Sequence, residues 1–419
     1  MSDRISNLPD SLLLHILSSK YLQTKDVIAT MLLSKIWKSL WLSIPKLEFY
    51  EKGFRSYESF LQFIDSTLNL VDSKSLKMFS LKCEYFDMPH DKVDIWVNTV
   101  LKSKLEYLNL CFAPCFDIMV TYPPLPSSTF NSNTIRILKL VRVKVSNLST
   151  VNLPSLKALH MMYVVFSDAE SLGMLLSKCV RLQELLLLYL GFPDDENMKL
   201  DIGRLHHLVI AKVSSVDLFR MEVFSNVTFL SLEEHDFFPG DYEFPTFYNL
   251  PQLEIHYLTQ KGWSSLVCCL RSFPKLETLI IYEGCKGLDW SMEAGPDNVP
   301  PCVSSNLKVF VLGGFNYLQS EFEILDSLVL TLGESMSPFS VAGPQGSKLG
   351  RIEFGCSPLE LENICPVWGS LKLVEDFVIL GKTLGSIGTL SGFQGVISIL
   401  ICLGSSYGEV LETAICNTG

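Results

Sequence analysis

Apolar residues recur at helical spacing through the first forty-five positions of the chain. Residues spaced three, four or one apart lie on one stripe of a helix, so each such run predicts an amphipathic helix. Three runs have this spacing: Leu8, Leu12, Leu13, Ile16 and Leu17; then Val27, Ile28, Met31 and Leu32; then Ile36, Trp37, Leu40 and Trp41. Pro9 suits the first turn of the first helix, Thr24 is a preferred N-cap for the second, and Pro45 ends the third.

This three-helix module is too small to be stable by itself. A unit of this size hides too little of its unfolded surface, and its two tryptophans and several leucines exceed what three short helices can bury. It is therefore either an N-terminal cap of the following domain or a docking module for another protein. We favour docking, since each large apolar side chain covered by a partner contributes about 1.5–3 kcal/mol.

From residue 76 onward a different pattern repeats, apolar-x-x-apolar-x-apolar, which is typical of the strand in a leucine-rich repeat. Ten units have it: Leu76-Phe79-Leu81, Leu105-Leu108-Leu110, Ile135-Leu138-Leu140, Leu156-Leu159-Met161, Leu182-Leu185-Leu187, Leu205-Leu208-Ile210, Val227-Leu230-Leu232, Leu250-Leu253-Ile255, Leu276-Leu279-Ile281 and Leu307-Phe310-Leu312. Each unit would supply one short strand with three inward side chains, and the segments between strands would cover the inward side. The pattern predicts an α/β solenoid with a curved parallel sheet.

Side chains that flank the inward positions should line the concave face of this sheet. We take six as candidate target-binding residues: Tyr107, His160, His207, Phe229, Glu254 and Tyr282. The wider set of flanking residues mixes aromatic, acidic and imidazole groups and includes one lysine, Lys139. That mixture favours a protein or a small polar ligand over a nucleic acid.

Composition and charge narrow the class of protein. The 419 residues are 48% hydrophobic and 19% charged, which indicates a folded protein, and the net charge of -11 argues against nucleic acid or an anionic membrane as partner. The 12 cysteines include no CxxC pair, and the N-terminus lacks a basic-then-apolar signal. We expect a cytoplasmic or nuclear protein with reduced thiols.

Candidate catalytic and metal motifs fail when each is considered in turn. Residues 233–236 read Glu-Glu-His-Asp, but adjacent strand residues point to opposite faces and cannot converge on a metal. Gly381-Lys382-Thr383 resembles the end of a phosphate-binding loop, yet Asp376 stands where that loop needs glycine. Cys268-Cys269 lacks a nearby histidine with an orienting partner. We predict no catalytic residue, no metal and no cofactor, and hence no enzyme.

The N-terminal residues resemble a known family. Asp3 to Leu13, then Ile16-Leu17-Ser18, Thr24 to Val27, Leu33-Ser34-Lys35, Trp37 and Leu40-Trp41 are similar to the F-box of plant F-box and leucine-rich-repeat proteins, although Gln23 replaces the usual proline and Ile36 the usual arginine. The resemblance implies docking on the Skp-type adaptor of a cullin-RING ubiquitin ligase. By that resemblance the contacts would be Leu8, Pro9, Leu13, Ile16, Leu17, Val27, Leu33, Ser34, Trp37 and Trp41.

The C-terminal part begins like the FBD domain of the same family and then departs from it. Trp290, residues 299–303 and residues 304–325 resemble the opening of that domain, whereas the last 94 residues hold 14 of the 25 glycines. Within the tail, residues 383–404 carry no charge, but their glycine, serine and threonine content makes a membrane span unlikely. We expect an F-box at 1–47, repeats at 70–290, a partial FBD-like segment at 291–325, and a poorly packed or disordered tail at 326–419.

Together these features predict a non-catalytic substrate-recognition subunit of a Skp–cullin–F-box ubiquitin ligase, with an unidentified protein as its target. Two alternatives share the fold. One is a leucine-rich-repeat scaffold that never joins a ligase. The other is a receptor whose repeats hold a small molecule, an idea that rests on fold analogy alone.

Overall fold

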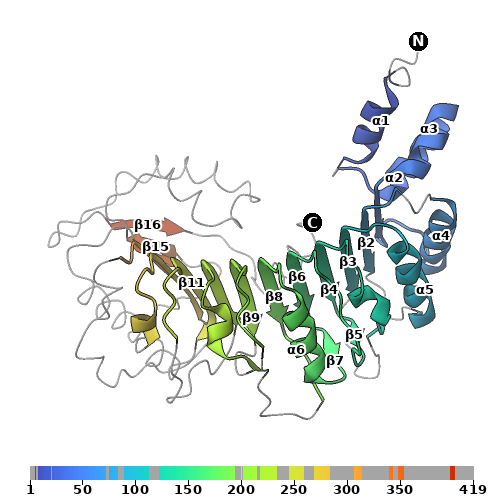
Figure 1. Ribbon diagram of the computed structural model, residues 1–419. Coiled ribbons are helices and arrows are strands. Elements are labelled where there is room, and N and C mark those ends of the chain that lie inside the picture. Colours follow the sequence, from blue (N-terminus) through green and yellow to red (C-terminus); the bar gives the residue numbers. More distant parts are fainter. Residues whose placement is uncertain are drawn as a thin grey trace. The chain divides into compact units, whose positions relative to one another are not determined.

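The computed structural model describes residues 5, 8–19, 21–71, 75–83, 89–112, 122–193, 200, 202–214, 218–233, 245–258, 269–283 and 306–313, with the backbone of three later strands at 339–342, 348–352 and 397–401. The chain divides into two compact units, residues 1–233 and 234–419. The first contains the helical N-terminus and a parallel sheet (Figure 1).

Helices occupy the N-terminal residues as the hydrophobic spacing predicts. They are α1 (Asp10–Leu17), α2 (Thr24–Ala29), the 3-10 turn η1 (Thr30–Leu32), α3 (Lys35–Leu40) and the 3-10 turn η2 (Trp41–Ser43). The start of α2 differs from prediction in one respect, because Gln23 and not Thr24 is its N-cap residue. The Gln23 backbone N–H donates to the Asp26 carboxylate at 3.1 Å. This acidic side chain therefore caps the N-terminus of α2.

Thr24 instead joins the helices to the sheet. Its side chain is 2% exposed, and its Oγ1 accepts a hydrogen bond at 2.6 Å from the backbone N–H of Glu48 in strand β1 (Lys46–Tyr50). The neighbouring Lys25 donates from Nζ to the carbonyl oxygen of Gly53 at 2.7 Å. The helical module is thus anchored to the first strand by named bonds.

Replacing Thr24 by valine should loosen this anchor. Valine keeps the shape of threonine but leaves the Glu48 N–H without its acceptor, and a buried donor left unpaired costs about 1–3 kcal/mol. We expect the free energy of unfolding to fall by that amount in urea titrations followed by circular dichroism. Ser39→Ala is the control, because the Ser39 hydroxyl bonds only locally, to the carbonyl of Ile36, at the surface. Equal stability of the wild type and Thr24→Val would contradict the anchoring role.

Eight strands of the first unit form a parallel sheet in the order β1-β2-β3-β4-β6-β8-β9-β10. Beyond β1 they are β2 (Met78–Cys83), β3 (Tyr107–Phe112), β4 (Ile137–Val141), β6 (Ala158–Met162), β8 (Glu184–Leu188), β9 (Ile210–Ser214) and β10 (Phe229–Glu233). A second, two-stranded sheet pairs β5 (Lys144–Val145) with β7 (Val165–Phe166). The parallel repeat fold expected from the sequence is confirmed.

The inward positions form the core almost as the pattern predicts. Leu108, Leu138, Leu159 and Leu185 occupy one register row across β3, β4, β6 and β8, and each is 0% exposed. Stacking of identical positions lets every repeat bury its apolar side chains against the next one, which no unit could do alone.

Two details of the repeat pattern were wrong. The array begins one unit earlier than the scan found, because Ile44, Leu47 and Phe49 have the same spacing and are at most 2% exposed. In the sixth unit the inward residues are Leu208, Ala211 and Val213, since Ala211 pairs with Leu185 and Val213 with Leu187. Ile210 therefore points outward, a shift of three residues from Leu205-Leu208-Ile210.

Helices and short turns fill the segments between strands. They are α4 (Tyr57–Leu70), α5 (His90–Leu101), η3 (Ser127–Phe130), α6 (Ala169–Lys178) and η5 (Met221–Phe224). Ser56 caps α4 by accepting the Ser59 N–H at 3.2 Å. Asp65 on α4 accepts hydrogen bonds from Lys92 Nζ and, at 2.7 Å, from Trp96 Nε1 on α5. This carboxylate therefore fixes the two helices side by side.

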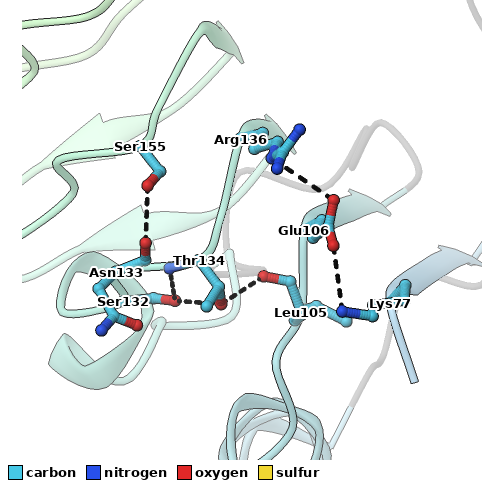
Figure 2. A network of polar contacts seen from close by, with 8 residues as sticks. All are labelled: Lys77, Leu105, Glu106, Ser132, Asn133, Thr134, Arg136 and Ser155. Carbon is cyan, nitrogen blue, oxygen red and sulfur yellow. Dashed lines mark hydrogen bonds and ion pairs between the residues drawn. The ribbon is translucent and has the colours of Figure 1, made fainter. Parts of the chain in front are cut away.

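Polar bonds link consecutive repeats at the start of the strands (Figure 2). The Glu106 carboxylate pairs with Lys77 Nζ at 3.1 Å on one side and with Arg136 Nε at 3.4 Å on the other. Thr134 Oγ1 donates to the carbonyl of Leu105 at 2.7 Å, and Ser155 Oγ to that of Asn133 at 2.7 Å. The ion pairs are largely exposed and add little stability, so the part-buried bond from Thr134 to Leu105 holds the register more firmly.

The second unit contains β11 (Gln252–Leu258), the turn η6 (Leu270–Ser272), β12 (Thr278–Glu283), β13 (Val309–Gly313), β14 (Phe339–Ala342), β15 (Lys348–Ile352) and β16 (Ile397–Ile401). β11 to β14 pair in parallel, whereas β14, β15 and β16 pair antiparallel. Of the FBD-like segment 291–325, only residues 306–313 are described, and they place β13 beside β12 in the predicted register.

Among the residues that the structure describes, no helix has the length and apolar character needed to cross a membrane. The uncharged stretch 383–404 lies outside the described residues apart from β16, which is a strand. Of the tail at 326–419 the structure describes only the backbone of β14, β15 and β16, and the other predictions for the tail fall outside the described part of the chain.

Candidate functional site

The ten residues that the family resemblance assigns to the adaptor divide into two groups. Leu8, Pro9, Ile16 and Leu33 are exposed, with Leu33 64% accessible, and Ser34 is half-buried. The other five are at most 4% exposed: Leu13, Leu17, Val27, Trp37 and Trp41. These five side chains belong to the core that holds the helices together, and their contact with the adaptor stays a prediction.

Three exposed apolar residues were missed by the sequence reasoning. Leu12 is 49%, Leu32 87% and Ile36 43% exposed. Together with the exposed leucines and isoleucine above they form what we call the F-box patch, which consists of Leu8, Leu12, Ile16, Leu32, Leu33 and Ile36. Leu12 and Ile16 lie four residues apart on one side of α1, and Leu8 lies just before that helix. The other three surround the turn from η1 into α3.

The sheet of the first unit carries a second candidate surface on the side away from its apolar core. Alternate strand residues point there, and their side chains are mostly half-buried. We call this surface the outward face. Its middle register row runs across the strands as Glu48, Ser80, Asn109, Lys139, His160, Leu186, Lys212 and Ser231.

Three of the predicted target-binding residues lie on this outward face. Tyr107 is on β3, where burial and then the nearby Glu48 carboxylate raise the pKa of its hydroxyl. His160 is on β6, and its Nε2 lies 2.8 Å from Glu184 Oε1 on β8. Phe229 is on β10, with Lys212 Nζ 5.3 Å from the centre of its ring. The sheet thus brings these aromatic and imidazole groups onto one side.

Glu184 is the acidic group of this face. The hydrogen bond from His160 lowers the pKa of the Glu184 carboxyl, against the opposing effect of burial, and the charges of Lys139 and Lys212 lower it further. The pKa of the Lys139 ammonium group is also lowered, but in this case the main cause is burial, which disfavours the charged form. The carboxylate is therefore ionised at neutral pH and sits among three basic side chains.

His207 is not on the outward face, contrary to the sequence prediction. It lies exposed in the turn before β9, because that strand begins at Ile210 and not beside Leu208. The shift of register brings Lys212 onto the face instead. The prediction that Lys139 is the one lysine on this surface was therefore wrong. Lys82 on β2 and Lys212 on β9 also lie there.

The remaining two predicted residues belong to the second unit. Glu254 is on β11, and its Oε1 lies 2.9 Å from Nε2 of His256. Tyr282 is on β12, directly opposite His256 in the register.

A row of left-handed residues follows β4, β6 and β8. Arg142, Tyr163 and Tyr189 have φ angles of 56°, 54° and 54°, which side chains other than glycine adopt only at a cost of about 1 kcal/mol or more each. Each stands two residues after an inward Leu140, Met161 or Leu187, a spacing that the sequence contains but that does not reveal the conformation.

Side-chain stacking accompanies this strain. Arg142 Cζ lies 4.7 Å from the ring centre of Tyr163, which stacks on Tyr189 at 4.8 Å with 13° between the planes. The Tyr189 hydroxyl donates to Glu233 Oε2 at 2.8 Å. After Arg142 and Tyr163 the chain continues into β5 and β7. The stacked side chains of this row therefore link neighbouring repeats at the end of the strands.

Nothing in the described residues assembles a nucleophile or a metal site. No group of three His, Cys, Asp or Glu side chains converges within the described ranges. Burial raises the pKa of the Cys179 thiol to about 12 and that of Cys83 well above its ordinary value, so both thiols stay protonated.

Comparison with known families bears on both surfaces. The F-box domain model matches residues 5–49, and the model described as At1g61320/AtMIF1, LRR domain matches residues 69–235. The chain combines an F-box with leucine-rich repeats. The first match includes β1, which the structure places in the sheet, so the F-box and the repeat array overlap by one strand.

Relatives from Arabidopsis thaliana share the same organisation. F-box/FBD/LRR-repeat protein At3g52680 is 29% identical over 418 residues, covering 86% of this chain and 87% of the relative. F-box/FBD/LRR-repeat protein At4g00160 is 28% identical over 78% of this chain and 83% of its own length. F-box/FBD/LRR-repeat protein At4g26340 is 35% identical over 48% of this chain and 46% of its length. The resemblance to plant F-box, repeat and FBD proteins is confirmed.

Proposed function

We propose that the chain is a substrate-recognition subunit of a Skp–cullin–F-box ubiquitin ligase. In this role the F-box docks on the Skp-type adaptor, and the repeats hold a target protein near the ubiquitin-transfer machinery. The chain performs no chemistry itself, because other subunits transfer ubiquitin and this one supplies proximity.

The exposed F-box patch is the observation that carries this proposal. Leu32 and Leu33 are 87% and 64% exposed in a module whose tryptophans are fully packed. Because the core of the module is already buried, these exposed leucines indicate a surface that binds a partner. Covering each leucine would stabilise the complex by about 1.5–3 kcal/mol. The match of residues 5–49 to the F-box supports a Skp-type adaptor as that partner.

The outward face supports the second half of the proposal. It presents aromatic, basic and acidic groups on a rigid parallel sheet, and such a mixture suits recognition of a protein surface. We also propose that the protein acts in the cytoplasm or nucleus, a location consistent with the free thiols of Cys83 and Cys179.

Reconstitution with purified subunits tests the role. A cullin–RING complex should be recovered on the immobilised full-length chain only when the Skp-type adaptor is added. Recovery of no cullin under either condition would favour a repeat scaffold outside a ligase. Recovery without the adaptor would show that the F-box is not the bridge. A thermal shift caused by a small molecule, in a chain that binds no adaptor, would favour the receptor alternative.

A further inference from the structure

Between β2 and β9 the charge of the outward face is opposite to that of the chain as a whole. The chain carries 34 Lys and Arg against 45 Asp and Glu. On the outward face from β2 to β9, however, the structure gathers Lys82, Lys139, His160 and Lys212 around a single carboxylate, Glu184. We call these five residues the basic centre.

Two lysines of the basic centre are not neutralised by their neighbours. Lys139 and Lys212 form no ion pair within the part of the chain that the structure describes, although Lys212 Nζ lies 5.3 Å from the Phe229 ring centre. Lys139 lies in the middle row between Asn109 and His160, where the charge of Glu184 and then the like charge of Lys82, two strands away, act on it. A half-buried ammonium group without a directly paired carboxylate gains from an anion supplied by a partner.

Glu184 indicates the chemistry of that anion. It reaches His160 at 2.8 Å, and the electrostatic influence of Lys139 and Lys212 extends to it from either side. One internal carboxylate thus already occupies the basic centre and leaves excess positive charge there. Further carboxylates can approach the same lysines from the solvent side.

We propose that the basic centre captures an extended acidic segment of the target protein. This inference rests on the proposed function, because it assumes that the outward face holds the target. Six strands separated by about 4.8 Å span roughly 24 Å from β2 to β9, which is the length of about seven extended residues. Acidic side chains of the segment pair with Lys139 and Lys212, and the Phe229 ring borders its end.

A protein segment fits this site better than a nucleic acid. Typical DNA-binding surfaces neutralise about six to ten phosphates, whereas the basic centre offers three lysines and one histidine. The acidic remainder of the chain, with its net charge of -11, repels a long polyanion at longer range. A short segment with a few carboxylates pairs with the local positive charge and is too small to be strongly repelled by the negative charge of the rest of the chain.

Fluorescence anisotropy with the full-length chain and two labelled probes tests the proposal. One probe is a peptide of about ten residues in which glutamate alternates with glycine, and the other has glutamine in place of glutamate. At low ionic strength we expect the acidic probe to bind at least about tenfold more tightly than the neutral one. The double variant Lys139→Glu, Lys212→Glu should lose about tenfold or more of that affinity.

Two variants guard against a trivial result. Lys102→Glu with Lys178→Glu makes the same change of net charge at exposed positions just after α5 and at the end of α6, and it should leave probe binding unchanged. Glu184→Gln removes the internal carboxylate and should strengthen binding of the acidic probe a few-fold. A variant that merely damaged the fold could not strengthen binding.

Several results would overturn the proposal. Equal binding of both probes, or equal loss in the two double variants, would remove the basic centre as an acidic-segment site. Tighter binding of a single-stranded RNA of similar length would make the site one for phosphates. Adaptor binding of the wild-type chain is measured in parallel. A wild-type chain that binds the adaptor but does not prefer the acidic probe refutes this inference alone, and one that prefers the acidic probe but does not bind the adaptor refutes the ligase role alone.

Discussion

Replacing Leu32 and Leu33 by aspartate is expected to raise the dissociation constant for the Skp-type adaptor by about a hundredfold or more. The two side chains are 87% and 64% exposed, so the fold does not depend on them. If the adaptor covers both, their loss removes roughly 3–6 kcal/mol of apolar burial, and about 2.7 kcal/mol already corresponds to a hundredfold change. Isothermal titration of the purified chain with the adaptor measures this effect.

A matched control separates the patch from exposed apolar residues in general. Ile95 on α5 and Val180 after α6 are 58% and 63% exposed, and both lie outside the F-box. The variant Ile95→Asp, Val180→Asp should bind the adaptor like the wild type, and both double variants should keep the wild-type melting temperature. Equal adaptor affinity of all three proteins would show that the patch is not the contact.

The second large effect concerns the register of β9. Ala211→Asn should lower the free energy of unfolding by about 3 kcal/mol, because the position is 0% exposed and an amide there is both too large and unpaired. Ile210→Asn should cost about 1 kcal/mol or less, since Ile210 points outward and only strand preference and partial burial are affected. Urea unfolding followed by circular dichroism compares the two neighbours directly.

The two registers make opposite predictions for this pair. With Leu205, Leu208 and Ile210 inward, as the sequence pattern suggested, Ile210→Asn would be the damaging change and Ala211→Asn the tolerated one. That outcome would also remove Lys212 from the outward face. The basic centre and its proposed acidic partner therefore depend on the result.

The sequence predicted the repeat strands well because the inward positions are mostly large apolar residues. The sixth unit failed for a physical reason: Leu205 and Leu208 are both buried, but the next inward residue is the small Ala211, so the pattern moved to the more hydrophobic Ile210. The first unit was missed because Ile44, Leu47 and Phe49 surround Pro45 and lie at the end of the F-box.

The F-box illustrates a different limit of sequence reasoning. Hydrophobic spacing located all three helices, but a leucine that packs in the core and one that awaits a partner look identical in the pattern. Leu13 is 0% exposed and Leu12 49%, although both belong to the same apolar run. Only the packing of α1 against the other helices separates the core from the patch.

The left-handed turns could not have been predicted from residue type. Glycine and asparagine usually signal such a conformation, whereas Arg142, Tyr163 and Tyr189 carry large side chains. Their stacking and the backbone bonds between adjacent repeats, such as Arg142 N–H to the Met162 carbonyl at 3.0 Å, exist only once the repeats have assembled.

Hydrogen–deuterium exchange of the full-length chain, with and without a saturating Skp-type adaptor, tests most directly whether the F-box patch is the docking surface. Adaptor binding should slow exchange in peptides covering α1 and the segment from η1 to α3. Peptides covering strands β2 to β10 should exchange as in the free chain. Unchanged exchange throughout the F-box, or protection confined to the strands, would contradict the assignment of docking to the helices and target capture to the sheet.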